Sequence, residues 1–156
     1  MELIIVRTIN VKPVEIAGNC RANLTVEDEF QIRGMQLENP RQSRLCLQAL
    51  SHLPPIVTQL QRETHCFAHV ICSDCLSRQG LENGVVFLLG HADKWELCQA
   101  ISAYDRLCDE REEPQTTRQL KAEAIQHLDR DEYSQAVQKM KAALEALKRA
   151  IALEEV

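Results

Sequence analysis

Hydrophobic positions in the first ninety residues fall mainly in short runs that are typical of β-strands. These runs are "ELIIVRTI" at 2–9, "DEFQIRGMQLE" at 28–38, "CFAHVIC" at 66–72 and "GVVFLLG" at 84–90. "NVKP" bounds the first run. Gly34 breaks the second, which predicts either a bulge or the arm of a hairpin there. The pattern therefore predicts a small sheet.

Between the second and third runs the apolar spacing lengthens to three or four residues. The positions are Leu45, Ala49, Leu53, Ile56, Val57 and Leu60. This spacing predicts an amphipathic helix from Gln42 onward. Pro54 and Pro55 interrupt it, because a proline inside a helix removes a hydrogen bond and clashes with the preceding turn. We expect the helix to stop and to restart with Pro55 near its first turn.

Every pattern after Asp93 is helical. A first stripe comprises Leu97, Cys98, Ile101, Tyr104 and Cys108, and a second comprises Leu120, Ala124, Ile125 and Leu128. The third, which we call the C-terminal stripe, comprises Tyr133, Val137, Met140, Leu144, Leu147 and Ile151. Its alternating steps of four and three residues require an apolar partner, either the preceding helix or another chain.

These elements predict an α+β fold in two domains. A small β-β-α-β-β sheet domain occupies 1–91, and a three-helix tail occupies 92–156. A chain of 156 residues can bury one small core and carry such a helical appendage.

Charge and hydropathy narrow the choice of partners. The formal net charge of -5 gives no overall attraction to nucleic acid or anionic lipid, although a local basic patch can persist inside an acidic total. The longest apolar runs are far too short to span a bilayer, and the chain does not open with an export signal. We expect a cytoplasmic protein that binds neither nucleic acid nor a membrane.

The segment "HCFAHVICSDC", residues 65–75, concentrates histidine and cysteine. If 66–72 form a strand, side chains alternate, so Cys66, Ala68, Val70 and Cys72 share one face, while Phe67, His69 and Ile71 share the other. His69 is then separated from the cysteines. The segment is therefore not expected to form one compact metal site.

Cys72 and Cys75 remain a candidate pair at the end of this strand. Their spacing suits a zinc or iron–sulfur knuckle, but a structural zinc needs four ligands, for which Cys20 and Cys46 are the candidates. The same spacing suits a redox dithiol, although the turn-rich loop that follows argues against one. With seven cysteines in all, an odd number, reduced structural thiols are the favoured interpretation. No cofactor is therefore predicted.

Signatures of catalysis are missing from the sequence. It contains no phosphate-binding glycine loop, nucleophile elbow, metalloprotease helix or calcium loop, so no catalytic residue is assigned and the pattern favours a protein that is not an enzyme. Among the histidines, His91 is the best placed for binding, because it follows a predicted strand.

The segment "LKAEAIQHLDRDEYSQAVQKMKAALEAL", residues 120–147, resembles the helical hairpin of a tetratricopeptide repeat. Ala124 matches the small position of the first helix, and Tyr133, Ala136, Met140 and Ala143 match packing positions of the second. A single unit is visible, whereas a stable array needs about three. The resemblance implies an antiparallel helical hairpin at 115–153 and does not imply a peptide-binding groove.

The first ninety residues resemble a family of small, uncharacterised, cysteine-containing prokaryotic proteins. The matching pieces are Cys20, "DEFQIRG", "RLCLQALSHLPPIV", "VICSDC" and "VVFLL". The resemblance implies a prokaryotic protein and carries no known activity.

Two functions follow as hypotheses. The leading one is a non-enzymatic interaction or accessory module whose C-terminal stripe binds another protein chain, either a second copy or a different protein. The alternative is a metal-binding or thiol redox protein centred on Cys72 and Cys75, with zinc or an iron–sulfur cluster as the metal.

Overall fold

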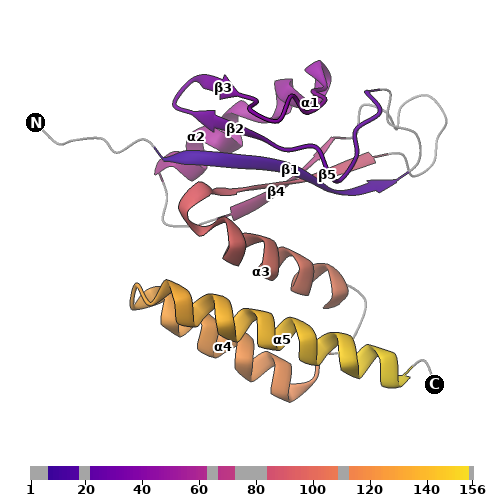
Figure 1. Cartoon of the computed structure of the whole chain (residues 1–156), viewed down its shortest axis with the longest axis vertical. Helices are drawn as coiled ribbons and strands as arrows, with labels where there is room; N and C mark the ends of the chain where they lie inside the picture. The colour runs from indigo at the N-terminus through magenta and orange to yellow at the C-terminus, as the bar shows by residue number, and fades with distance from the viewer. Residues whose placement is uncertain (1–6, 18–21, 63–66, 73–83, 109–112, 155–156) are drawn as a thin grey trace, which may run out of the picture. The chain divides into compact units, whose positions relative to one another are not determined.

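The computed structural model describes residues 7–17, 22–62, 67–72, 84–108 and 113–154 (Figure 1). The chain divides into two compact units, Met1–Trp95 and Glu96–Val156, which we call the sheet unit and the helical unit. Among the described residues, no helix combines the length and apolar character needed to cross a membrane.

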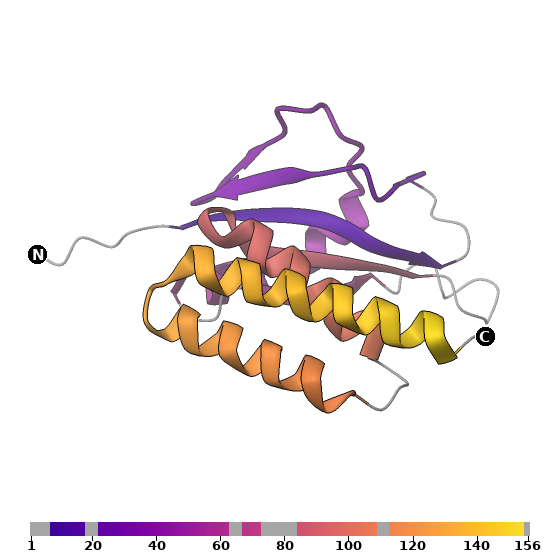
Figure 2. The same cartoon turned by 60° about the horizontal axis from the view of Figure 1, so that its bottom comes forward.

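The sheet unit is built on one antiparallel sheet. Its strands are β1 (Thr8–Ala17), β2 (Phe30–Arg33), β3 (Gln36–Glu38), β4 (Phe67–Cys72) and β5 (Gly84–His91), in the order β3-β2-β1-β5-β4. Every neighbouring pair is antiparallel. The predicted α+β class, a small sheet followed by a helical tail, is confirmed (Figures 1 and 2).

The predicted end of the first strand is wrong. β1 does not stop at "NVKP" but continues to Ala17, and its pairing with β5 extends from Ile9 to Ala17. β2 pairs with β1 only over Thr8–Val11, so Pro13 lies where β1 has lost one neighbour, and the β5 register shifts between Pro13 and Glu15. A proline is tolerated there because its missing N–H is not needed on the open side. Residues 2–6 lie outside the described residues.

Gly34 is the turn of a hairpin, one of the two predicted alternatives. Gln31–Arg33 pair with Gln36–Glu38 across it. Gly34 has φ 60°, a backbone conformation that glycine adopts without a steric penalty. The turn is so tight that Met35 leads directly into β3.

The helical segment breaks at the prolines, as predicted. α1 (Leu47–His52) ends before Leu53, and α2 (Pro54–Arg62) starts with both prolines in its first turn. The predicted start at Gln42 is wrong by five residues. Before α1, the Asn39 side chain accepts from the Ser43 N–H and donates to the Ser43 carbonyl, both at 2.8 Å. Such local bonds hold the backbone in a turn and delay the helix.

The core of the sheet unit lies between the sheet and α1–α2. The strands contribute Ile9, Val11, Phe30, Cys72, Val85, Phe87 and Leu89, and the helices contribute Ala49, Val57 and Leu60, with Leu53 between them. Along β5 the core residues occur at every second position, as expected for one face of a strand.

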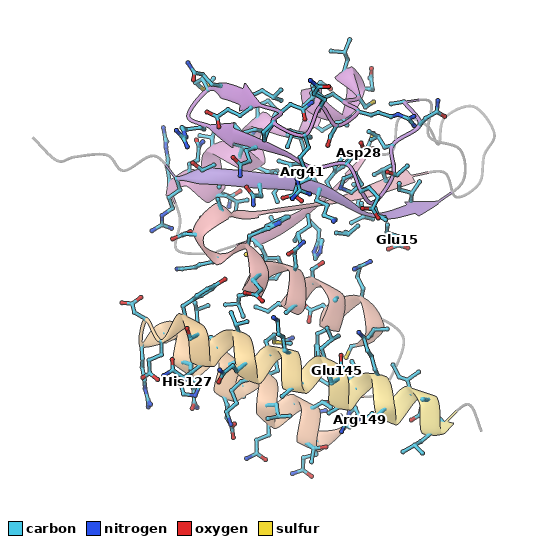
Figure 3. All side chains as sticks on the ribbon, viewed as in Figure 1. Glu15, Asp28, Arg41, His127, Glu145 and Arg149 are labelled. Atoms are coloured by element: carbon cyan, nitrogen blue, oxygen red, sulfur yellow. The ribbon has the colours of Figure 1, made fainter. Side chains whose placement is uncertain are left out.

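The helical unit comprises α3 (Trp95–Cys108) from its second residue onward, α4 (Gln115–Asp129) and α5 (Tyr133–Glu154). A short 3-10 turn at Ala92–Lys94 precedes α3. α4 and α5 form the predicted antiparallel hairpin (Figures 1 and 2). At its turn, Asp131 has φ 57° and its N–H donates to the Leu128 carbonyl at 3.1 Å, which ends α4. His127 lies near this turn, and Glu145 and Arg149 lie farther along α5 (Figure 3).

Candidate functional site

β4 splits the cysteine and histidine segment as predicted. Ala68, Val70 and Cys72 pack on the core of the sheet unit. Phe67 and His69 lie on the other face, where their rings meet edge to face with centroids 5.7 Å apart. His65, Cys66 and Cys75 lie outside the described residues. Within β4, the prediction that His69 and Cys72 point in opposite directions is confirmed.

The proposed thiol ligands are only partly placed by the structure. Cys72 is 4% exposed within the core, and Cys46 is half-buried against the same core. Cys20 and Cys75 lie outside the described residues. Within the described part of the chain, no group of three or more histidine, cysteine or acidic side chains is arranged to hold a metal ion. The metal and redox hypotheses remain predictions that depend on Cys20 and Cys75.

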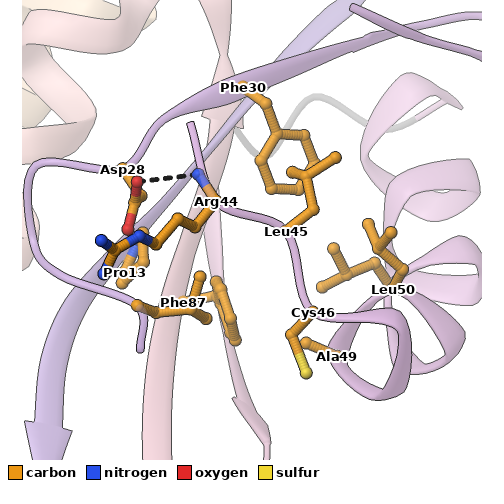
Figure 4. A pocket seen from close by; sticks show the side chains of 11 residues that line it. Pro13, Asp28, Phe30, Arg44, Leu45, Cys46, Ala49, Leu50 and Phe87 are labelled. Carbon is orange, nitrogen blue, oxygen red and sulfur yellow. Dashed lines mark hydrogen bonds between the residues drawn. The ribbon is translucent and has the colours of Figure 1, made fainter. Parts of the chain in front are cut away.

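Cys46 borders a small cavity between the sheet and α1 (Figure 4). At its mouth the Arg44 backbone N–H donates to Asp28 Oδ1 at 2.9 Å, and Arg44 Nη1 donates to the Asn23 carbonyl at 2.7 Å. The cavity volume is about 10 Å³, which is room for one water molecule at most. This cavity is a packing gap, too small for a ligand.

His91 holds the sheet to α2. Its side chain is 1% exposed, and Nε2 lies 2.8 Å from the Leu60 carbonyl oxygen, to which the neutral ring donates. Burial lowers the pKa of His91, although the hydrogen bond to Leu60 opposes this shift. The histidine that the sequence placed best for binding is therefore committed to a structural contact.

The C-terminal stripe is partly used inside the chain. Val137, Met140 and Leu147 are buried, and Tyr133, Leu144 and Ile151 are half-buried. Whether this stripe also binds another chain stays a prediction, but its buried half is not free to do so.

An apolar groove runs between the β2–β3 hairpin and the two helices of the sheet unit. Its volume is about 230 Å³. The lining residues are Ile32, Gly34, Met35, Leu37, Leu50, Leu53, Pro54, Val57 and Thr58. Thr58 supplies the one polar side chain of this set, and none of the nine is ionisable. We call this feature the hairpin groove.

Large apolar side chains gather around the hairpin groove. Met35 is 95% exposed, Leu37 is 42% exposed, and Leu47, one helical turn before the lining residue Leu50, is 86% exposed. Single exposed apolar residues are normal on any protein surface. Here two of them line one groove and the third lies one helical turn from it, so the exposed apolar surface is contiguous rather than scattered.

The walls of the hairpin groove are held in place by local structure. Gln61 Nε2 donates to the Gly34 carbonyl at 3.1 Å, which ties α2 to the hairpin turn. On the helix side, Leu53 is fully buried at the junction of α1 and α2. Both walls of the groove are therefore anchored, the hairpin turn by Gln61 and the helix junction by Leu53.

Sequence reasoning missed this site. The sequence placed Met35 and Leu37 in a strand with a bulge or in the arm of a hairpin, without a groove beside them, and Leu47 lies outside the predicted apolar face of the helix. The signal in the sequence that could have indicated the groove was a large apolar residue, Met35, directly after the turn residue Gly34. Comparisons with protein-family models, with curated proteins and with solved structures found no match. Both resemblances noted in the sequence therefore stay predictions.

Proposed function

We propose that this chain is a non-enzymatic interaction module that binds an apolar segment of another protein in the hairpin groove. The observation that carries the proposal is the exposure of Met35 and Leu37, which line an apolar groove, together with the exposure of Leu47 one helical turn before the lining residue Leu50. Exposed apolar surface next to a concave site is characteristic of binding surfaces.

The lining of the groove supports binding over catalysis. General acid–base and nucleophilic chemistry require titratable groups that reach the substrate, and the nine lining residues contain none. The volume of about 230 Å³ also lies below the roughly 300 to 1,000 Å³ of pockets that enclose a small molecule. A site of this size suits one or two anchoring side chains of a protein partner.

The proposal keeps the class of function expected from the sequence and changes the surface. The C-terminal stripe has Val137, Met140 and Leu147 buried, whereas the hairpin groove has Met35 and Leu47 exposed. Affinity in protein interfaces comes mainly from a few apolar anchors that become desolvated. The groove offers such anchors without unfolding the chain.

Site-specific photo-crosslinking tests this proposal. A photoreactive amino acid is placed at position 35 or 47 of the full chain, in cells that express it naturally, and at position 153 as a control. Leu153 is apolar and 77% exposed but lies on α5 in the helical unit. We expect a discrete protein adduct from positions 35 and 47 that position 153 does not give. The same adducts from all three positions, or none from 35 and 47, would contradict the proposal.

A further inference from the structure

We infer that the occupant of the hairpin groove is an acidic apolar segment of a partner protein, in which large apolar residues are flanked by carboxylates. The inference rests on the proposed function and specifies the partner class. It is carried by the charge of the surface that surrounds the groove.

The stretch that supplies the helical wall of the groove lacks acidic residues. Residues 39–62 contain Arg41, Arg44 and Arg62 and no aspartate or glutamate, whereas the whole chain has 23 acidic residues against 18 basic ones. The helical wall of the groove therefore carries no carboxylate, and Arg62 is the one arginine of residues 39–62 whose charge is not already engaged by a described residue. A cation with no facing carboxylate favours a partner segment of opposite charge.

Arg62 is the cation best placed to meet that segment. Arg62 is exposed and is the last residue of α2. It follows Thr58 by four residues and Pro54 by eight, so the three side chains share one face of the helix. Thr58 and Pro54 line the groove on that face. Within the described residues Arg62 forms no ion pair. Arg41 and Arg44 are already engaged, Arg41 Nη1 at 3.6 Å from Glu29 Oε2 and Arg44 with Asn23.

The nearest carboxylate on the hairpin does not oppose this assignment. Glu38 lies on β3 next to Leu37, so its side chain points to the opposite face of the hairpin from the groove. There its Oε1 lies 3.8 Å from Arg33 Nε. The groove side of the hairpin therefore presents Ile32, Met35 and Leu37 without a negative charge.

Apolar contact and charge have separate roles in this arrangement. Desolvation of Met35 and Leu47 supplies most of the affinity, whereas an exposed ion pair with Arg62 adds a small, salt-sensitive increment. We expect Arg62→Gln to weaken binding about two- to fivefold. The charge mainly selects which apolar segments bind.

Selection from a library of random displayed peptides on the immobilised full chain tests the inference. The counter-target is Met35→Ser with Leu47→Ser, which removes apolar anchors without changing charge, and the matched control is Leu153→Ser. Met35 and Leu47 are exposed, so the double variant keeps its fold, which circular dichroism checks. We expect enriched peptides that are apolar and acidic, that bind Leu153→Ser like the wild type, and that bind the double variant at least tenfold more weakly.

The outcomes separate the inference from the function on which it rests. If no peptide distinguishes the wild type from the double variant, the proposed function fails and the inference fails with it. If groove-dependent peptides emerge but are neutral or basic, and Arg62→Gln leaves their affinity unchanged, the function stands and the inference is wrong. Acidic peptides that lose affinity on Arg62→Gln and in raised salt support both.

Discussion

The sheet unit and the helical unit differ in how many of their large apolar side chains are left exposed near one another. In the helical unit, α4 and α5 bury Ala124, Val137, Met140 and Leu147, and the surface carries ion pairs. Two of these pairs join Lys121 to Asp105 at 2.8 Å and Lys139 to Glu123 at 2.9 Å. In the sheet unit, the hairpin and α1 leave Met35 and Leu47 exposed.

The difference follows from the lengths of the elements. α4 and α5, of 15 and 22 residues, lie along each other and can bury continuous stripes. β3 has three residues and α1 has six, so neither is long enough to cover its neighbour's apolar side chains. Short elements at one end of the sheet therefore leave an apolar groove uncovered, whereas the long paired helices bury each other's apolar stripes.

Paired leucines on α5 give the largest expected contrast. Leu147 is 2% exposed and Leu153 is exposed on the same helix. We expect Leu147→Ala to lower the free energy of unfolding by about 2 to 5 kcal/mol, because it opens a cavity. Leu153→Ala should stay within about 0.5 kcal/mol of the wild type. Urea unfolding followed by circular dichroism compares them, and equal effects would show that the C-terminal stripe is not internal core.

Tyr104 tests the polar interior of the helical unit. Its side chain is fully buried, and its hydroxyl donates to Glu113 and lies 3.1 Å from Thr117 Oγ1. Burial and the bond to Glu113 both raise the pKa of Tyr104, so the hydroxyl stays protonated. Tyr104→Phe should destabilise the protein by about 1.5 to 3 kcal/mol, as expected for a hydrogen bond to a charged acceptor.

Glu113→Gln is the control for that measurement. It keeps an acceptor for the Tyr104 hydroxyl but removes the charge, so its cost in urea unfolding should be smaller. A Tyr104→Phe variant that unfolds at the same urea concentration as the wild type would show that this contact contributes nothing to stability.

His91 makes the stability of the sheet unit depend on pH. Burial, together with the charges of Arg7 and Lys94, lowers its pKa below 6.5, while the Leu60 hydrogen bond and Asp93 oppose the shift. Below pH 6.5 the unfolded chain binds a proton that the folded chain does not, so stability falls as the pH falls. The slope is at most about 1.4 kcal/mol per pH unit.

His91→Gln isolates this contribution. Glutamine can still donate to the Leu60 carbonyl but does not titrate. Melting temperatures of the wild type and of His91→Gln are measured from about pH 7.5 to 5.5, across the range where histidine titrates. We expect the wild type to lose more melting temperature than the variant on the acidic side of this range, and the two profiles to run parallel on the other side. Parallel pH profiles would mean that His91 gains its proton as readily in the folded protein as in the unfolded chain.

Met35 and Leu47 give the smallest expected change in stability. Met35→Ser and Leu47→Ser remove side chains that are already exposed, so each should shift the free energy of unfolding by no more than about 0.5 kcal/mol. Thermal unfolding of the purified chain measures this. A loss above about 1 kcal/mol in either variant would mean that the side chain is covered in the folded protein and that the groove is not free.

The sequence by itself determined the features that depend on local periodicity. Alternation along 67–72 placed His69 and Cys72 on opposite faces, "LPP" marked the junction of α1 and α2, and Gly34 marked a break in the second strand. Four-and-three spacing predicted that the last helix has an apolar partner, and the resemblance to a tetratricopeptide unit predicted that the hairpin of α4 and α5 supplies it. Such features need only the geometry of a strand or helix, which repeats every two or every 3.6 residues.

Tertiary structure alone decided the features that depend on contacts between distant residues. β1 continues through Pro13 because β5 pairs with it, and His91 is structural because the Leu60 carbonyl lies within reach of its ring. The hairpin groove exists because Gly34 and Thr58, separated by 24 positions in the chain, lie on facing walls. No local pattern encodes that approach, since the distance between two elements is determined by the packing of everything between them.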